Sequence, residues 1–247
     1  MRVIGFMPCH YGADYLKEAL LSVIDLCEKF VIVYSSKPSY SHGTDAKCPD
    51  TEIELLDIAL KVCGTKLIWH KHEFANEGEH RGHIYRYANH LKSDLILSID
   101  SDEIFLTSEL KVALETAYKG DKRYYGIGGY INFWKSFEWA CYDSFVPIRI
   151  TNLHNQSGEG VLPCTVYHFS CAQREEIMRY KLLVHGHKDE IRPRWLEDIY
   201  LKWTPENNFG NLHLVSYIPA LWNATPFDKT TLPQILKDHP NYNKHLI

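Results

Sequence analysis

Residues 95–105, LILSIDSDEIF, join an apolar run to three carboxylates at positions 100, 102 and 103. The alternating apolar pattern predicts a strand whose acidic end lies at the carboxyl edge of an open α/β sheet, where such sheets build their sites. Carboxylates this close repel one another unless a cation or a water-filled cleft relieves the repulsion. Mg²⁺ and Mn²⁺ prefer oxygen ligands of this kind and keep coordination positions for substrate phosphates. Asp100 and Asp102 therefore indicate a metal–diphosphate site, with a solvated acidic turn as the alternative.

Size and composition narrow the class of protein. The chain has 247 residues, enough for one large α/β domain or two small ones. A net charge of −4 gives no overall basic field for nucleic acid. The N-terminal segment MRVIGFMP lacks the apolar run of a signal peptide, and no stretch has the ~18 apolar residues of a membrane span. The seven cysteines form no C-x-x-C pair, which favours free thiols and a cytoplasmic location.

Strand-like and helix-like segments alternate regularly in the first half of the chain. Short apolar segments of strand length occur at residues 2–7, 30–34, 66–70 and 95–99. Apolar residues at helical spacing occupy the stretches between them, at about residues 15–28, 51–62 and 76–91. This alternation predicts an α/β fold with a mostly parallel sheet and helices on both faces.

The second half has a different pattern, with aromatic-rich, strand-like pieces and helical spacing at residues 174–184 and 194–203. These features predict a smaller, mixed α+β half. Because no linker, repeat or low-complexity tract interrupts the chain, we expect a single domain over residues 1–247. Residues 1–106 would bind a nucleotide, and residues 107–247 would bind the molecule that reacts with it.

The predicted helix at 76–91 carries a second signal. Glu77 and Arg81 share one helical face with Ile84 and Ala88, the residues that would pack on the sheet. The two charged residues fall in the first turns, next to the acidic strand end. An arginine there can pair with the carboxylates or bind a phosphate through two hydrogen bonds. The alternative is an exposed i,i+4 Glu–Arg pair.

Several motifs follow one another in a fixed order. N-E-x-x-x-R, an apolar strand and D-x-D-E-I occur within residues 76–104, followed by the aromatic stretch INFWKSFEW, HFS at residues 168–170 and HGHKD at residues 185–189. In this order the motifs resemble the GT-A glycosyltransferases, most closely the β-1,4-N-acetylglucosaminyltransferase-like branch with its bacterial and viral relatives. The resemblance covers roughly residues 1–200. It implies the GT-A fold, a Rossmann-like, mostly parallel central sheet flanked by helices, with a smaller mixed α+β acceptor side.

The resemblance also implies an activity. The chain would be a metal-dependent glycosyltransferase that moves a hexosyl or pentosyl group from a nucleotide-sugar, chiefly a UDP-sugar, to a hydroxyl of a glycan or glycoconjugate. Asp102 would bind Mn²⁺ or Mg²⁺ directly, while Asp100 would contact metal-bound water or the ribose. Arg81 would support the carboxylates or the donor phosphates. A later histidine, His187 first and His168 second, would complete the metal shell or donate to the diphosphate.

The nucleoside would lie at the ends of the first two strands, near the helix that carries Glu77. The candidate residues at these strand ends are Pro8, His10, Tyr34 and Ser35. Tyr34 can stack on the base, or it can be the last core residue of its strand, and both interpretations stay open.

An inverting enzyme needs a general base to deprotonate the acceptor hydroxyl. Glu138 lies inside the aromatic stretch, where burial would raise its pKa toward the working pH. Asp198 is the second candidate, and Glu197, Asp189 and Glu190 are rivals. A retaining enzyme would need no such base.

Two other functions remain as alternatives, and nothing in the pattern indicates an oligomeric state. A zinc-dependent hydrolase would use the histidines at positions 70, 72, 80 and 83, although closed Cys/His ligand sets are absent. A viral glycosyltransferase acting on hydroxymethylated bases in DNA would need a basic groove. The candidates for that groove are Arg174, Arg179, Lys181, Arg192 and Arg194. These cations fit a solvated helix face better, so a DNA partner is not favoured.

Overall fold

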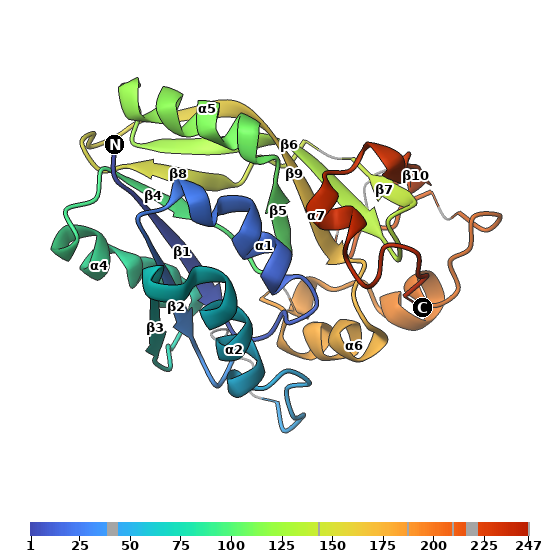
Figure 1. Cartoon of the computed structure of the whole chain (residues 1–247). Coiled ribbons are helices and arrows are strands. Elements are labelled where there is room, and N and C mark those ends of the chain that lie inside the picture. Colours follow the sequence, from blue (N-terminus) through green and yellow to red (C-terminus); the bar gives the residue numbers. More distant parts are fainter. Residues whose placement is uncertain (39–43, 143, 187, 209, 216–221, 247) are drawn as a thin grey trace.

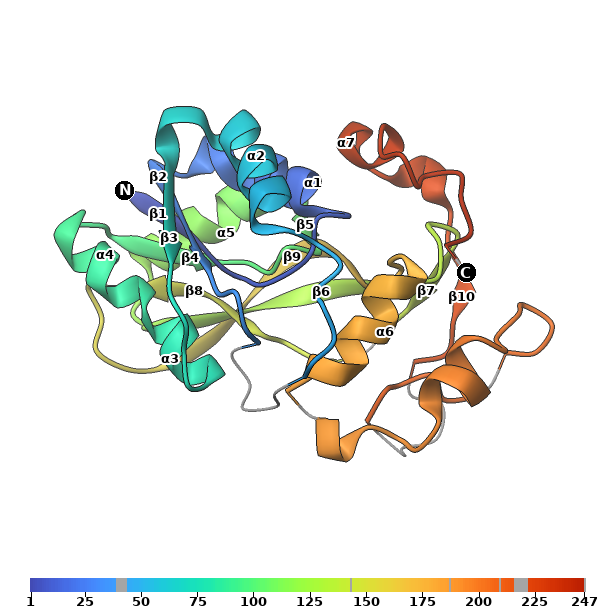
Figure 2. The same cartoon turned by 90° about the horizontal axis from the view of Figure 1, so that it is seen from below.

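The computed structural model describes residues 1–38, 44–142, 144–186, 188–208, 210–215 and 222–246. Within these residues one ten-stranded sheet runs through the molecule, with helices packed on it (Figures 1 and 2). Among the described helices, none combines the length and the apolar character that crossing a membrane requires. The expected α/β class is confirmed.

The first half of the chain forms the parallel part of the sheet. Its strands are β1 (Val3–Cys9), β2 (Lys29–Tyr34), β3 (Leu67–Lys71) and β4 (Leu95–Ser98). They pair in the order β4-β1-β2-β3, and each agrees with its predicted strand to within two residues. Because successive side chains point to opposite faces, Val3 and Met7 enter one hydrophobic cluster while Ile4 and Phe6 enter another.

Helices cover both faces of this parallel part. Figure 2 shows α1 (Leu16–Val23), α2 (Glu52–Cys63) and α5 (Thr107–Lys119) on one side, and α3 (Glu77–Gly82) and α4 (Ile84–His90) on the other. The helix predicted over 76–91 is present as two segments, α3 and α4, separated only by His83, whose backbone angles are also helical.

The second half extends the same sheet with mainly antiparallel strands. They are β5 (Glu103–Phe105), β6 (Tyr124–Trp134), β7 (Trp139–Cys141), β8 (Ile148–Asn152), β9 (Glu159–Cys171) and β10 (Thr225–Pro226). β8 pairs antiparallel with β4, β6 lies beside β8, and β9 joins β6 to β5. Hydrogen bonds therefore continue across the sheet from the first half into the second.

Short helices complete the second half. They are α6 (Glu175–Val184), η3 (Lys188–Glu190), the π-helix η4 (Leu196–Tyr200), η5 (Lys229–Thr231) and α7 (Gln234–Lys237), while η1 (Ile24–Leu26) and η2 (Gly64–Lys66) belong to the first half. The helix predicted at 174–184 is confirmed as α6. The longer helix predicted at 194–203 is reduced to the π-helix.

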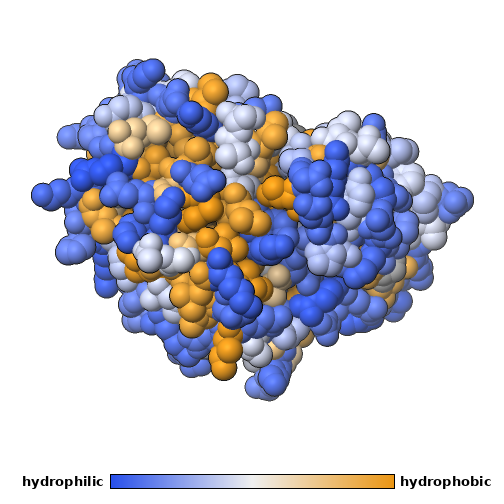
Figure 3. All heavy atoms as spheres, in the orientation of Figure 1, coloured by the Kyte–Doolittle hydropathy of each residue, from blue (hydrophilic) through white to orange (hydrophobic). Residues whose placement is uncertain are grey.

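Most aromatic residues of the second half belong to the core. Phe133, Trp134 and Phe137 are fully buried, and Phe169 stacks on Phe133 with ring centroids 4.5 Å apart. Figure 3 shows hydrophobic side chains gathered over α1 and α2, whereas the C-terminal side of that face is mainly hydrophilic. The aromatic stretch therefore serves chiefly to pack the second half of the sheet.

Candidate functional site

The acidic segment forms a tight turn between β4 and β5. The backbone N–H of Glu103 donates to the Asp100 carbonyl at 3.2 Å, and the Glu103 side chain accepts from the Asp100 N–H at 3.2 Å. Gly12, in the loop after β1, has φ +126°, and a Cβ there would lie 2.0 Å from Ser101 Oγ. Only glycine allows this close approach, which brings the loop after β1 against the acidic turn.

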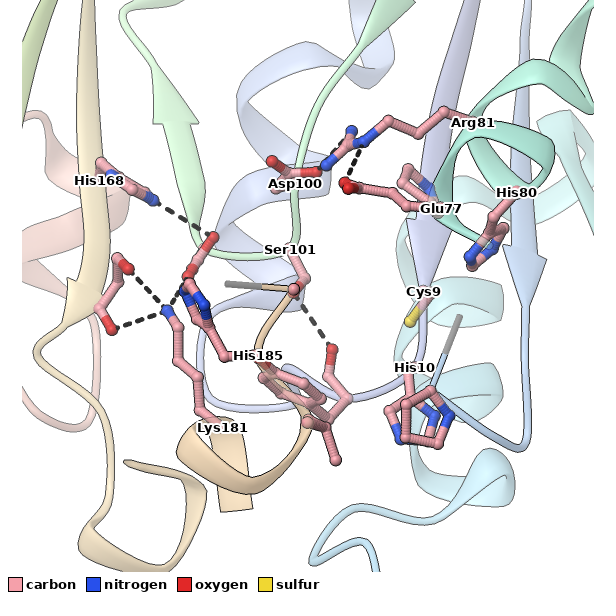
Figure 4. Close-up of a pocket in the computed structure, with 17 residues that line it drawn as sticks. Cys9, His10, Glu77, His80, Arg81, Asp100, Ser101, His168, Lys181 and His185 are labelled. Carbon is pink, nitrogen blue, oxygen red and sulfur yellow. Dashed lines mark hydrogen bonds and ion pairs between the residues drawn. The ribbon is translucent and has the colours of Figure 1, made fainter. Parts of the chain in front are cut away.

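A cavity of about 300 Å³ opens beside this turn, at the carboxyl edge of the parallel strands. We call it the first cavity. Seven residues predicted for the site line it: Pro8, His10, Glu77, Arg81, Asp100, Asp102 and His168. Figure 4 shows Arg81, Glu77 and His10 on one side and His168, Lys181 and His185 on the other. The acidic turn thus faces cationic and imidazole side chains from both halves of the chain.

Asp100 is bound by two arginines. Arg81 Nη1 lies 3.2 Å from Asp100 Oδ1, and Arg149 Nη2 lies 2.8 Å from Oδ2. Burial alone would raise the pKa of Asp100, but Arg149 and then Arg81 hold it well below its usual range. Because both oxygens already accept from guanidinium groups, Asp100 is poorly placed to ligate a metal ion directly, and its expected contact with metal-bound water or the ribose stays a prediction.

Asp102 has a different environment. Gln173 Nε2 donates to Asp102 Oδ2 at 2.9 Å. His168 Nε2 lies 3.7 Å from Oδ1 and Lys181 Nζ lies 3.9 Å from Oδ2, both beyond hydrogen-bond distance. Asp102 is therefore the better-placed carboxylate of the turn for a divalent ion that also binds substrate phosphates.

Lys181 and His168 are held in place by their neighbours. Lys181 Nζ donates to the Ser170 carbonyl at 3.0 Å and to Ser170 Oγ at 2.6 Å. His168 Nδ1 lies 2.8 Å from Asn132 Oδ1, an oxygen that only accepts, so Nδ1 carries the proton in this pairing. Nε2 then lies toward Asp102 Oδ1, 3.7 Å away, at the first cavity.

The short helix α3 places Glu77 and Arg81. Its N-cap residue, Asn76, accepts a hydrogen bond from the Glu79 N–H at 2.9 Å. Arg81 Nε donates to Glu77 Oε1 at 2.6 Å while the same guanidinium reaches Asp100. Of the roles open to Arg81, support of the carboxylates is the one the structure shows.

The residues at the ends of β1 and β2 separate into two groups. His10 lines the first cavity, where its Nδ1 pairs with the Ser35 carbonyl at 2.8 Å and its Nε2 with the Tyr180 hydroxyl at 2.7 Å. Ser35 itself is buried. Tyr34 is also buried and stacks on Trp69, with centroids 5.7 Å apart, so it is a core residue and does not face the cavity.

Neither candidate base lies at the first cavity. Glu138 is 45% exposed and pairs with Lys229 at 2.8 Å, and this hydrogen bond lowers its pKa, so the expected raised pKa is wrong. The neighbouring aromatic side chains turn into the core while Glu138 points outward. Asp198 pairs with Arg194 at 2.7 Å and Lys202 at 2.8 Å on the surface, and these hydrogen bonds lower its pKa.

The described residues do not include a complete set of side-chain ligands for a metal ion. His187, the expected metal ligand, lies outside the described residues. Among the residues that the structure describes, no three His, Cys, Asp or Glu side chains converge as a metal site. The histidines considered for zinc instead stack ring on ring, with His70 and His83 centroids 4.8 Å apart.

Sequence reasoning missed two polar residues of this region, Arg149 and Gln173, whereas Ser170 and His185 stood in the motifs HFS and HGHKD without an assigned role. Arg149 is 49 residues from Asp100 in the chain and reaches it because β8 pairs with β4. In the sequence, the only indication of a role for Arg149 is its position as a charged residue inside an otherwise strand-like segment, PIRITNL. Lys181 was noticed only as a candidate surface cation, although it lines the first cavity.

No protein-family model and no curated protein matches this sequence. Among solved structures, the chain is similar to TarS of S. aureus, with 15% identity over 85% of this chain and 45% of that chain, TM-score 0.46. TarS 1-349 matches at 15% identity over 74% of this chain and 64% of that chain, TM-score 0.45. The same fragment in complex with UDP matches at 18% identity over 54% of this chain and 36% of that chain, TM-score 0.39. The chain spans less than two thirds of each of these structures, so we argue the function from the site itself.

Proposed function

We propose that this chain is a GT-A-type glycosyltransferase that transfers a sugar from a nucleotide-sugar, a UDP-sugar, to a hydroxyl of a glycan or glycoconjugate. From the order of its motifs, we propose that it is most similar to the β-1,4-N-acetylglucosaminyltransferase-like branch. One observation carries the proposal. The acidic turn after β4 opens into a cavity at the carboxyl edge of parallel strands, where Arg81 and Lys181 approach it from opposite sides. Open α/β sheets bind nucleotides at this edge.

Cationic side chains would stabilise the departing nucleoside diphosphate. Negative charge develops on the diphosphate as the bond to the sugar breaks, and preorganised cations near that charge lower the barrier. Lys181 is anchored on Ser170, and Arg81 is oriented by Glu77 and Asp100. Mn²⁺ or Mg²⁺, held by Asp102 together with donor phosphates, would supply additional Lewis-acid stabilisation of this leaving group.

His168 is our candidate for the base of an inverting reaction. Its Nδ1–H is engaged by Asn132, which leaves Nε2 to accept a proton from the acceptor hydroxyl. Glu138 and Asp198 are not retained for this role, because both lie in surface ion pairs.

A DNA acceptor is not favoured. Several cations of the suggested basic groove are already paired with carboxylates: Arg174 with Asp50 at 2.6 Å, Arg179 with Glu175 at 2.5 Å, and Arg194 with Asp198. A glycan or glycoconjugate needs no such groove, so it remains the proposed acceptor.

Thermal unfolding with UDP-, GDP-, CMP- and dTDP-sugars, each with and without Mn²⁺, tests the proposal. A ligand present at 100 times its Kd stabilises the folded state by about 2.7 kcal/mol, so a UDP-sugar should raise the melting temperature visibly. Lys181→Met should reduce the shift, whereas the matched variant Lys111→Met, on the exposed side of α5, should not. If none of the nucleotide-sugars stabilises the protein, the proposed function is wrong.

A further inference from the structure

A second cavity, of about 670 Å³, adjoins the first. It lies between β9, α6 and the segments around residues 144–146 and 213–215. His168, Ser170, Lys181 and His185 line both cavities and so form a shared wall. A molecule in the second cavity would therefore meet the contents of the first across this wall.

The lining of the second cavity is amphipathic. Four polar residues form the shared wall, and Asn132, Ser144 and His213 are the other polar residues, while the rest of the lining is largely apolar. The apolar part includes Phe145, Val146, Met178, Leu182, Leu214 and Trp222. Phe145 is 65% exposed, so much of its ring is in contact with water. The volume is within the range of small-molecule sites.

We propose that the second cavity binds the acceptor, and that the acceptor is an amphipathic glycoside whose sugar hydroxyl meets the shared wall and whose alkyl or aryl group lies against the apolar lining. This inference rests on the proposed glycosyltransferase function and adds the class of acceptor. A wholly polar glycan would leave hydroxyls against apolar side chains without hydrogen-bond partners, which disfavours its binding. An apolar group on the glycoside would instead remove hydrophobic surface from water.

The placement of the two cavities suits a direct transfer. The acceptor oxygen forms a bond to the anomeric carbon of the donor sugar as the bond from that carbon to the diphosphate oxygen breaks. The bonding electrons leave with the nucleoside diphosphate, and the hydroxyl proton passes to His168 Nε2. Both substrates can reach this imidazole because it lines both cavities.

Matched pairs of acceptors test the proposal: octyl and methyl β-glycosides of glucose, galactose and N-acetylglucosamine, offered with a UDP-sugar. Product formation is followed by UDP release and by mass spectrometry. The octyl member of the accepted pair should have a kcat/KM at least tenfold higher, mainly through a lower KM. Equal kcat/KM values for octyl and methyl glycosides would overturn the proposal.

A pair of neighbouring leucines provides the variants. Leu182 lines the second cavity, whereas Leu183, the next residue on α6, is 41% exposed and lines neither cavity. Leu182→Asn should raise the KM for the octyl glycoside several-fold more than the KM for the methyl glycoside. Leu183→Asn should change neither KM. Equal effects of the two variants, at equal melting temperatures, would count against the apolar cavity.

Donor binding separates the two proposals. If a UDP-sugar stabilises the protein but methyl glycosides react as well as octyl glycosides, the acceptor inference fails and the proposed function stands. If no UDP-sugar binds or is hydrolysed, both fail together.

Discussion

At the scale of single residues, Arg149 connects the acidic turn to the core. Its guanidinium donates to Asp100 at 2.8 Å and to Glu103 at 2.5 Å, and the Tyr130 hydroxyl donates to Glu103 at 3.0 Å. Glu103 is 1% exposed, so its charge depends on this arginine. A buried carboxylate without a partner is strongly unfavourable. Arg149 thus holds the turn in the shape that presents Asp102 to the cavity.

Arg149→Met should therefore lower the free energy of unfolding by about 3–5 kcal/mol, because it leaves the buried Glu103 carboxylate without its cationic partner. Urea unfolding followed by tryptophan fluorescence measures the loss. Arg179→Met, which removes an exposed i,i+4 pair with Glu175, is the control and should cost under ~1 kcal/mol. Similar small losses in both variants would show that the Arg149 network does not stabilise the fold.

Asp102→Asn should reduce turnover with a UDP-sugar by about 10²–10³-fold, since a neutral amide replaces the carboxylate in the charged part of the site. The side chain keeps its size, and we expect a change in unfolding free energy of about 1 kcal/mol or less. Steady-state assays and urea unfolding measure the two effects. Asp121→Asn, an exposed aspartate paired with Lys122, should leave both unchanged. Wild-type turnover in Asp102→Asn would remove this residue from the proposed mechanism.

At the scale of secondary-structure elements, α3 and α2 both have a side-chain N-cap but differ in whether they hold residues at the first cavity. α3 has an Asn76 cap and holds Glu77 and Arg81 at the first cavity, whereas α2 has a Thr51 cap and packs on the far face of the sheet. The Asn76 cap, which stabilises the first turn of α3, therefore also helps to position Glu77 and Arg81 at the first cavity. Thr51 itself does not line the first cavity, although Asp50 before it accepts hydrogen bonds from the N–H groups of Gly12 and Ala13.

Asn76→Ala and Thr51→Ala should each cost about 1 kcal/mol of stability, because each removes a side-chain acceptor at a helix N-terminus. Only Asn76→Ala should also weaken UDP binding, since Arg81 moves with α3. Calorimetric titration with UDP and urea unfolding compare the two variants. Equal UDP affinities would contradict the link between the α3 cap and the site.

The histidines between β3 and α4 should make the stability of the folded state depend on pH. Burial, followed by His70, Arg86 and His72, lowers the pKa of His83 to about 4, whereas an unfolded histidine titrates near ~6.5. Between these values the unfolded chain binds more protons at this position, so stability falls as the pH drops from about 6.5 toward 4. His83→Gln should flatten this decline in urea midpoints, and His90→Gln, exposed on α4, should not. Parallel profiles for wild type and His83→Gln would contradict the assignment.

At the scale of the whole molecule, the C-terminal segment packs against the loop after β1. His239 Nε2 donates to the Asp14 carbonyl at 2.8 Å, and its ring stacks on Tyr15 with centroids 4.6 Å apart. Leu232 and Leu236 are buried in the aromatic cluster that contains Phe137. The C-terminal segment thus joins the loop after β1 to the second half of the sheet.

Leu236→Ala should lower the free energy of unfolding by about 2–5 kcal/mol, because a fully buried side chain leaves a cavity between α7 and α1. Leu60→Ala, on α2 and 51% exposed, should cost under ~1 kcal/mol. Urea unfolding measures both. A small loss in Leu236→Ala would indicate that the C-terminal segment contributes little to the folded state.

The features of this protein that the sequence alone determined are those set by local residue patterns. The four parallel strands, their covering helices and the position of Asp100 and Asp102 at a strand end follow from the periodicity of apolar residues within short windows. Only the tertiary structure decided the partners of those residues. Arg149 reaches Asp100 through strand pairing, Gln173 and Lys181 reach Asp102 from the other half, and Lys229 pairs with Glu138 on the surface. Such contacts join residues tens of positions apart, and they depend on how the sheet and helices pack, which no local pattern encodes.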